Sequence, residues 1–150
     1  MTQITRTDAQ NPDFKALIAL LDMDLQARYG AIQDEYDQFN DVSLIPYVVV
    51  AYFNDQAVGC GAFKPFDATQ VEIKRVFVKD TSRGQGVAQL LLAELEKWAK
   101  ELEFEACILE TGDRQHEAIE LYHKKLGYEI IPNYEPYVGM EHSICMRKVL

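Results

Sequence analysis

The chain of 150 residues has little cysteine and a shortage of positive charge. Its three cysteines (Cys60, Cys107 and Cys145) form no C-x-x-C pair and lie in apolar stretches, so we expect reduced core thiols. The three histidines are too scattered to indicate a metal site. Only 15 lysines and arginines stand against 24 acidic residues, which disfavours nucleic acid and anionic membranes as partners and favours cationic substrates.

Long apolar segments are also missing. No apolar run approaches the ~20 residues of a membrane span, and the N-terminus has no basic stretch followed by an apolar one. We therefore expect a soluble, cytoplasmic protein with no membrane partner. A chain of 150 residues with 48% hydrophobic content and no linker or repeat predicts one domain over residues 1–150, which folds without a disulfide or a metal.

Apolar periodicity and turn residues predict an α/β domain with a mixed sheet. Residues 32–40 are polar and acidic, and they predict either a second short helix or a loop. The buried stripe of the longest central helix is expected to consist of Leu91, Leu95, Trp98 and Leu102. The expected strands cover residues 3–7, 47–53, 57–63, 71–78, 106–109, 128–131 and 143–149. The expected helices cover about 13–29, 88–102 (the central helix) and 115–126.

The strand over residues 71–78 changes phase in its middle. Val71 and Ile73 share one face, whereas Val76 and Val78 fall on the opposite parity. Because side chains alternate between the two faces of a strand, such a change predicts a β-bulge, here near residues 74–76. A bulge would splay this strand from its neighbour and leave backbone groups available to a ligand.

A turn with two glycines, Gly84 and Gly86, follows this strand and leads directly into the next helix. The first N–H groups of a helix lack intrahelical acceptors, and the helix dipole is positive at that end, so the turn predicts a phosphate site. It matches neither G-x-x-x-x-G-K nor G-x-G-x-x-G, so neither a nucleotide P-loop nor a dinucleotide fingerprint is indicated. The basic residues expected around the turn are Lys74, Arg75, Lys79 and Arg83.

Three segments, in this order, resemble the GCN5-related N-acetyltransferase (GNAT) family. They are Glu72–Val78, Arg83–Leu92, which begins with the R-x-x-G-x-A turn Arg83–Ala88, and Ala118–Tyr128. The last reads A-I-E-L-Y-H-K-K-L-G-Y and holds one residue more than the family's A-x-x-L-Y-x-K-x-G-F/Y. The resemblance covers nearly all of the chain. It implies a single-domain GNAT-like fold with a mixed, mostly antiparallel sheet of about seven strands, splayed central strands and about four flanking helices.

The resemblance also implies acetyl-CoA as the acyl donor, with no metal. In such enzymes the pyrophosphate binds main-chain amides of the turn, and the pantetheine arm pairs with the splayed strand. Gln115 stands where the family often has an asparagine that contacts the cofactor. The cofactor-binding residues expected on this basis are Val76, Phe77, Val78, Arg83, Gly84, Gln85, Gly86, Val87, Ala88 and Gln115.

Two residues match catalytic positions of the family. Glu72 matches the general base of histone-modifying members, and the alternative is a solvated carboxylate or one paired with Lys74 or Arg75. Tyr122 matches the tyrosine that protonates the leaving thiolate, and the alternative is a core aromatic.

The loop between the last two expected strands carries Tyr134 and Tyr137. In this family the corresponding loop often lines the acceptor pocket. The two rings are expected either to bracket an ammonium group by cation–π contact or to pack in a homodimer interface, and the sequence leaves both open.

The resemblance implies an acetyl-CoA-dependent N-acetyltransferase. We expect a primary amine, more readily that of a small molecule than of a protein, to attack the thioester directly in a ternary complex. Since no cysteine has a histidine beside it in the sequence, no acyl-enzyme is expected. The alternatives are acetylation of a protein N-terminus or lysine, and a regulatory module that binds CoA without turnover.

Overall fold

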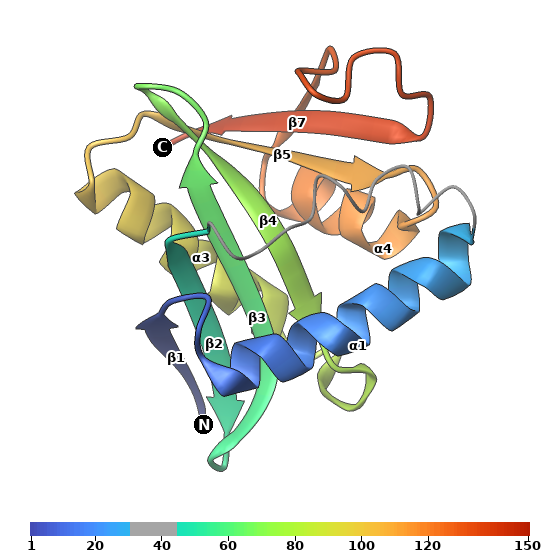
Figure 1. Cartoon of the computed structure of the whole chain (residues 1–150). Coiled ribbons are helices and arrows are strands. Elements are labelled where there is room, and N and C mark those ends of the chain that lie inside the picture. Colours follow the sequence, from blue (N-terminus) through green and yellow to red (C-terminus); the bar gives the residue numbers. More distant parts are fainter. Residues whose placement is uncertain (31–44) are drawn as a thin grey trace.

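The computed structural model describes residues 1–30 and 45–150. A seven-stranded sheet in the order β1-β2-β3-β4-β5-β7-β6 forms its centre (Figure 1). Neighbouring strands are antiparallel except for β4 and β5, which confirms the predicted mixed, mostly antiparallel sheet. The strands are β1 (Thr2–Thr7), β2 (Tyr47–Phe53), β3 (Gln56–Pro65), β4 (Gln70–Val78), β5 (Ala106–Gly112), β6 (Glu129–Ile131) and β7 (Ser143–Val149).

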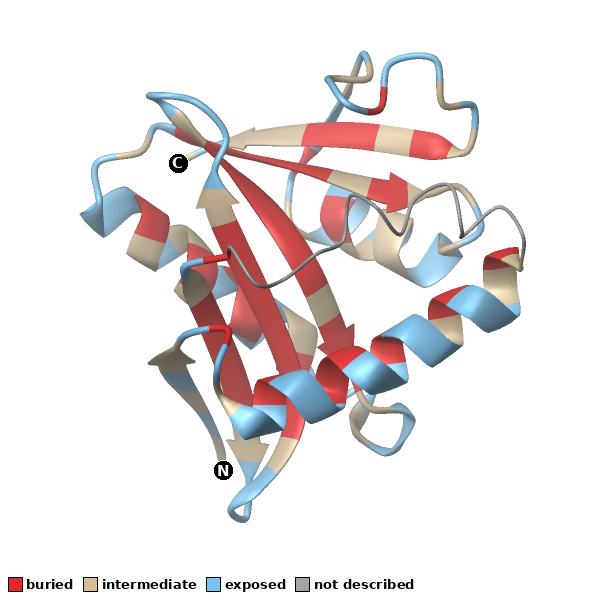
Figure 2. Cartoon of the chain, viewed as in Figure 1, coloured by how far each residue is buried: buried red, intermediate tan, exposed pale blue. Residues whose placement is uncertain are grey.

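Helices cover both faces of the sheet. Figure 1 shows α1 (Pro12–Tyr29) crossing one face and α3 (Val87–Glu101) lying on the other. A short helix α4 (His116–Ile119) continues as the π-helical turn η2 (Glu120–Lys125) and packs with α3 in one hydrophobic core, while α1 packs in a second. Figure 2 shows buried residues concentrated along the central strands, which contribute side chains to both cores.

The expected elements agree with the structure within a few residues, apart from two points. The segment 32–40, predicted as a helix or a loop, lies outside the described residues. The expectation that Leu102 is buried is wrong, because α3 ends at Glu101 and Leu102 is 39% exposed just beyond it. None of the helices in the described ranges is both long and apolar enough to span a membrane.

The predicted bulge is present in β4. Lys74 pairs with Ala62 of β3 and Phe77 with Cys60, so Arg75 and Val76 together oppose the single residue Gly61. Arg75 adopts a positive φ of 60°, which is the backbone distortion at this point. Because one extra residue is inserted, the apolar residues before and after the bulge pack into the same core with α3.

The bulge coincides with the point at which β4 and β5 separate. Their parallel pairing runs from Gln70–Ala106 to Ile73–Leu109. Beyond it, β4 follows β3 to Val78, whereas β5 follows β7 to Gly112. The two strands therefore diverge, as Figure 1 shows, and this divergence confirms the predicted splay of the central strands.

The extra residue in the segment Ala118–Tyr128 is accommodated by the π-helical turn η2. The N–H of Leu126 donates to the carbonyl of Leu121, five residues earlier, at 3.0 Å. A π-turn holds one residue more than an α-turn, so the insertion lengthens the helix end without shifting Tyr122 relative to the preceding turn. Gly127, at φ 78°, follows the end of the helix, in the left-handed conformation that glycine favours there.

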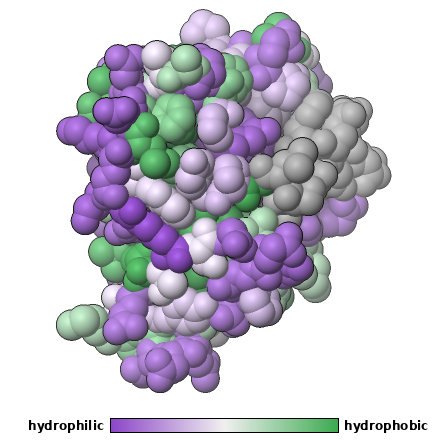
Figure 3. Space-filling view, turned by 60° about the vertical axis from the view of Figure 1, so that its left-hand side comes forward, coloured by the Kyte–Doolittle hydropathy of each residue, from purple (hydrophilic) through white to green (hydrophobic). Residues whose placement is uncertain are grey.

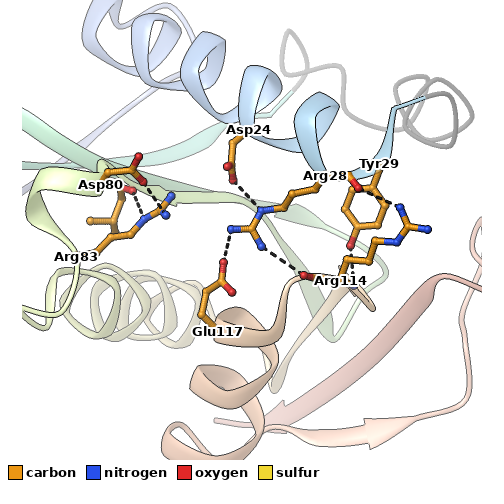
Figure 4. Close-up of polar contacts among 8 residues, drawn as sticks. Asp24, Arg28, Tyr29, Asp80, Arg83, Arg114 and Glu117 are labelled. Atoms are coloured by element: carbon orange, nitrogen blue, oxygen red, sulfur yellow. Dashed lines mark hydrogen bonds and ion pairs between the residues drawn. The ribbon is translucent and has the colours of Figure 1, made fainter.

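The C-terminal end of α1 is fastened to the loop that leads into α4 (Figure 4). Arg28 forms ion pairs with Asp24 and Glu117, and Arg114 donates from Nη1 to the carbonyl of Arg28 at 3.0 Å. The backbone N–H of Arg114 donates to the Tyr29 hydroxyl at 3.0 Å. Ion pairs this exposed contribute little, so we expect the packing of Tyr29 to contribute more.

We predict that Gly112→Ala destabilises the protein through Tyr29. A Cβ on Gly112 would collide with the phenol oxygen and ring of Tyr29, so the ring must leave its position. Overpacking of this kind lowers the free energy of unfolding by about 1–3 kcal/mol. Urea unfolding of the variant and the wild type measures this loss of free energy. In the Tyr29→Ala background the same substitution should have little effect, and an equal loss in both backgrounds would contradict the proposed contact.

Candidate functional site

A cavity of about 120 Å³ lies where β4 and β5 diverge. Its walls come from the two strands, from α1, from the start of α4 and η2, and from the loop before β7. The lining residues are Leu21, Leu25, Tyr29, Glu72, Ile73, Lys74, Arg75, Val76, Leu109, Glu110, Thr111, Gly112, Gln115, Ala118, Tyr122, Tyr137 and His142.

The two sides of the cavity differ in chemistry because strand side chains alternate. Ile73 and Leu109 point into the core shared with α3 and η2, and so does the ring of Tyr122. Glu72, Lys74 and Glu110 have the opposite parity and therefore lie on the α1 face. The opening between the strands thus joins an apolar side, which carries one phenol, to a side that carries carboxyl and ammonium groups.

The glycine turn lies at the entrance to α3 and is exposed from Gly84 to Gly86. Both glycines have positive φ values, 75° and 80°, which side-chain-bearing residues seldom adopt. The first α3 amide with a main-chain acceptor is that of Leu90, which donates to the carbonyl of Gly86 at 3.2 Å. The amides of the turn before it are therefore presented to solvent in an arrangement suited to an anion.

Arg83 holds this turn against the end of β4. Its Nε donates to the carbonyl of Val78 at 3.0 Å, and its Nη1 lies 2.7 Å from Asp80. The guanidinium also stacks over the ring of Phe77, with 5.8 Å between Cζ and the ring centroid. Figure 4 shows the ion pair of Arg83 with Asp80 beside the α1–α4 network.

Lys74 and Arg75, expected around the turn, lie instead in the wall of the cavity. Lys74 donates to the hydroxyl of Tyr137 at 3.2 Å, and Arg75 pairs with Asp22 of α1. The sequence-based expectation that these two cations surround the glycine turn is therefore wrong. The bulge explains the difference, because it bends β4 at this point, before the chain reaches the glycine turn.

Glu72 is 4% exposed and lies in the cavity wall. It accepts a hydrogen bond from the Tyr134 hydroxyl at 2.9 Å, and the Lys74 ammonium is 3.8 Å from its other oxygen. Burial, together with the adjacent Glu72 charge, raises the pKa of Tyr134. Both predictions for Glu72, a general base or a paired structural carboxylate, are compatible with this position.

Glu110 is a site residue that the sequence reasoning missed. It lies one residue beyond the last paired level of β4 and β5, lines the cavity, and accepts a hydrogen bond from Ser143 at 2.7 Å. Burial raises its pKa to about 7, and the hydrogen bond from Ser143 and the charge of Lys74 act in the opposite direction. A carboxyl group that titrates near neutrality is suited to accept a proton from an amine.

Tyr122 is 7% exposed, and its ring packs edge-on against Tyr128. Burial raises the pKa of its phenol, so it stays protonated at neutral pH. The residue lines the cavity from η2, on the apolar side. A protonated phenol in this place is chemically able to donate to a leaving thiolate.

Three further predicted residues, Tyr134, Tyr137 and Gln115, lie in the wall of the same cavity or directly behind it. Tyr137 is 2% exposed and lines it, and Tyr134 packs edge-on against Tyr137 with 5.6 Å between centroids. Gln115 also lines the cavity, and its side chain hydrogen-bonds the phenol of Tyr29.

The alternative prediction for Tyr134 and Tyr137 was that they pack in a homodimer interface. Exposed large hydrophobic side chains come from separate elements, among them Met23, Phe53 and Ile130. On the face seen in Figure 3, hydrophobic residues (green) lie between hydrophilic ones (purple). A homodimer therefore stays a prediction.

The cysteines lie where their sequence contexts indicated. Cys60, Cys107 and Cys145 are buried, unpaired thiols, as predicted. Within residues 1–30 and 45–150, no group of three or more histidine, cysteine or acidic residues is arranged to hold a metal ion. His142 lies beside the cavity and contacts Asp113 through Nδ1 at 3.0 Å.

Comparison with known proteins places these features in a family context. The family model described as the Acetyltransferase (GNAT) family matches residues 13–128. An IAA acetyltransferase of Azospirillum brasilense is 35% identical over 103 residues, which cover 68% of this chain and 67% of that protein.

Solved structures agree over nearly the full length. A protein of Klebsiella pneumoniae subsp. pneumoniae MGH 78578, assigned to the acyl-CoA N-acyltransferases, superposes with a TM-score of 0.83 at 32% identity and covers 100% of this chain and 98% of its own. A GNAT family acetyltransferase of Elizabethkingia anophelis with acetyl-CoA bound has a TM-score of 0.72 at 21% identity, over 99% and 98% of the two chains. At that identity the likeness concerns the fold.

We predict that the thiols of the folded protein are unreactive. Burial raises the pKa of Cys60 and Cys107 to about 12 and that of Cys145 to about 11. Since the thiolate is the reactive form, at pH 8 each should react with a disulfide reagent at least about 100-fold more slowly than a free thiol. All three should react at once in denaturant. A rapidly labelled thiol in the folded protein would contradict this prediction and reopen the acyl-enzyme route.

Proposed function

Because the chain belongs to the GNAT acetyltransferase family, we propose that it transfers the acetyl group of acetyl-CoA to the primary amine of a small molecule, in a ternary complex. The observation that carries this proposal is the opening between β4 and β5, which has Tyr122 on one side and two carboxyl groups, Glu72 and Glu110, on the other. Donor and acceptor can therefore meet from opposite faces of the sheet.

On the donor side, the turn from Gly84 to Ala88, exposed as far as Gly86, offers amides for the diphosphate of acetyl-CoA. The pantetheine arm would then lie along Val76–Val78, on the edge of β4 that has left β5. Gln115 and Val76 line the cavity at the thioester end. An acetyl-CoA bound in the Elizabethkingia anophelis structure, which has the same fold, supports this assignment.

The reaction needs no covalent enzyme intermediate. The amine nitrogen forms a bond to the thioester carbonyl carbon while a backbone N–H near Val76 polarises the carbonyl oxygen. The C–S bond then breaks, and Tyr122 gives its proton to the departing CoA thiolate. The proton lost by the amine passes to a carboxylate on the α1 face, either directly or through water.

Two carboxylates compete for that last role, and we assign it to Glu110. Its pKa of about 7 suits a base at neutral pH, whereas Glu72 already accepts a hydrogen bond from Tyr134 and lies near Lys74. In this assignment Glu72 holds Tyr134 in place. The family resemblance instead assigns the base to Glu72, so the two residues must be compared directly.

A small acceptor is favoured by the enclosure of the site. The cavity of about 120 Å³ is walled on the acceptor side by α1, by Tyr137 and by His142. The buried position of Tyr137 limits access by a folded protein surface. Acetylation of a protein N-terminus or lysine is the second candidate within the enzyme class, and a CoA-binding module without turnover is the candidate outside it.

We predict that Tyr122→Phe lowers the rate of acetyl transfer by about 100-fold, the contribution expected of a general acid, with unchanged affinity for acetyl-CoA. Thiol release from acetyl-CoA with a panel of amines measures the rate, and calorimetry measures the affinity. Tyr52→Phe removes a phenol far from the cavity and serves as the control. An unchanged rate removes Tyr122 from the mechanism, and binding without turnover of any amine supports the module.

We also predict that the pH profile of kcat/KM distinguishes the two carboxylates. A base with a pKa of about 7 loses activity as pH falls through 7, because the protonated carboxyl no longer accepts a proton. With one acceptor throughout, the amine's own titration is common to all variants. Glu110→Gln should remove the limb near pH 7 and Glu72→Gln should retain it. The reverse pattern would assign the base to Glu72.

A further inference from the structure

Two adjacent cations form part of the wall of the cavity on the acceptor side. Lys74 is 8% exposed and Arg75 is 7% exposed. Consecutive residues of a regular strand point to opposite faces, but here both side chains lie on the α1 face: Lys74 shares the parity of Glu72, and Arg75 contacts Asp22 of α1. The bulge therefore places a second positive charge beside the first.

The ammonium of Lys74 is incompletely paired. It donates one hydrogen bond, to the Tyr137 hydroxyl at 3.2 Å, although an ammonium group has three donors. Among the described residues its nearest carboxylate oxygen belongs to Glu72, at 3.8 Å, which is beyond hydrogen-bond distance. Burial lowers the pKa of Lys74; the charges of Glu72 and Glu110 act in the opposite direction, and those of Lys64 and Arg75 in the same one. An anion beside Lys74 would supply what its surroundings lack.

Arg75 is the second cation of this wall. Its Nη2 pairs with Asp22, but its buried Nε has no hydrogen-bond partner within the described part of the chain. Buried polar atoms of folded proteins are nearly always hydrogen-bonded, so such an atom calls for an explanation. A ligand that brings negative charge to this wall would stabilise both cations at once.

The carboxyl groups of the same cavity are engaged differently. Glu72 accepts a hydrogen bond from Tyr134, and its other oxygen lies 3.8 Å from the ammonium of Lys74 and 4.0 Å from that of Lys64. Glu110 accepts a hydrogen bond from Ser143 through one of its two oxygens. The cavity thus offers a cationic wall at Lys74 and Arg75 and a carboxyl group at Glu110. A molecule with one negative and one positive end matches both.

We infer that the acceptor is a small amine that also carries a carboxylate, of the amino-acid class. Its carboxylate accepts hydrogen bonds from the Lys74 ammonium, and Arg75 contributes charge beside it. Its amino group lies toward Glu110, where the proton is removed. This inference rests on the proposed acetyl transfer and adds the chemical class of the acceptor.

The expected discrimination follows from the environment. A carboxylate gains a charge-assisted hydrogen bond from a buried ammonium, whereas the matching amide brings no charge and leaves Lys74 as poorly paired as before. A site built to bond a polar group rejects an analogue that lacks it. We expect kcat/KM for an amino acid to exceed that for its own amide by about tenfold or more, mainly through KM.

The test uses pairs of acceptors that differ only in this group: free amino acids and their carboxamides, each with acetyl-CoA and the full chain. The acid-to-amide ratio of kcat/KM is measured for the wild type, Lys74→Met, Lys74→Arg and Lys100→Met. Lys74→Met keeps the length of the buried chain without its charge, and Lys74→Arg restores the charge. Lys100→Met makes the same change at an exposed position on α3 and is the control.

The inference predicts a ratio of about ten or more in the wild type and in Lys100→Met, a ratio near one in Lys74→Met, and partial recovery in Lys74→Arg. Equal turnover of acids and amides by the wild type overturns it and leaves acetyl transfer intact, and the wild-type comparison does not depend on the folding of any variant. A loss of rate in Lys74→Met that is equal for both acceptors also overturns it. Binding of acetyl-CoA with no turnover of any amine overturns the proposed function itself.

Discussion

The β-bulge of β4 is the constraint on which the rest of the structure depends. Arg75 and Val76 together oppose Gly61, so the strand bends away at the level where its pairing with β5 ends, Ile73 with Leu109. Apart from the bulge itself, β4 stays paired with β3 up to Val78. What is lost is the parallel ladder, and the space that this loss creates is the cavity.

The same distortion separates two kinds of chemistry. Tyr122 reaches the cavity from the core shared with α3, where burial keeps its phenol protonated. Glu110 and Lys74 reach it from the face covered by α1, where hydrogen bonds from Ser143 and to Tyr137 hold them. The sheet therefore acts as a partition with one opening. In the proposed mechanism, the donor and the acceptor meet at this opening while their other parts remain on different sides of the sheet.

Local patterns predicted the features that depend on a few neighbouring residues. The change of parity after Ile73 predicted the bulge, and Gly84 and Gly86 predicted the turn before α3, where their φ values are 75° and 80°. Glu110 was missed because its pKa depends on Ser143 and Lys74, which are distant in the sequence. The predicted positions of the Lys74 and Arg75 side chains were wrong for a similar reason. Their positions depend on contacts with Tyr137 and with Asp22 of α1, which are distant in the sequence.

A crystal structure of the protein with CoA bound tests the central claim most directly, namely that the opening between β4 and β5 admits the coenzyme. The account predicts the pantetheine arm along Val76–Val78, the diphosphate on the amides between Gly84 and Ala88, and the sulfur within reach of the Tyr122 hydroxyl. A coenzyme bound outside the opening, or strands that close against each other when it binds, would contradict the account.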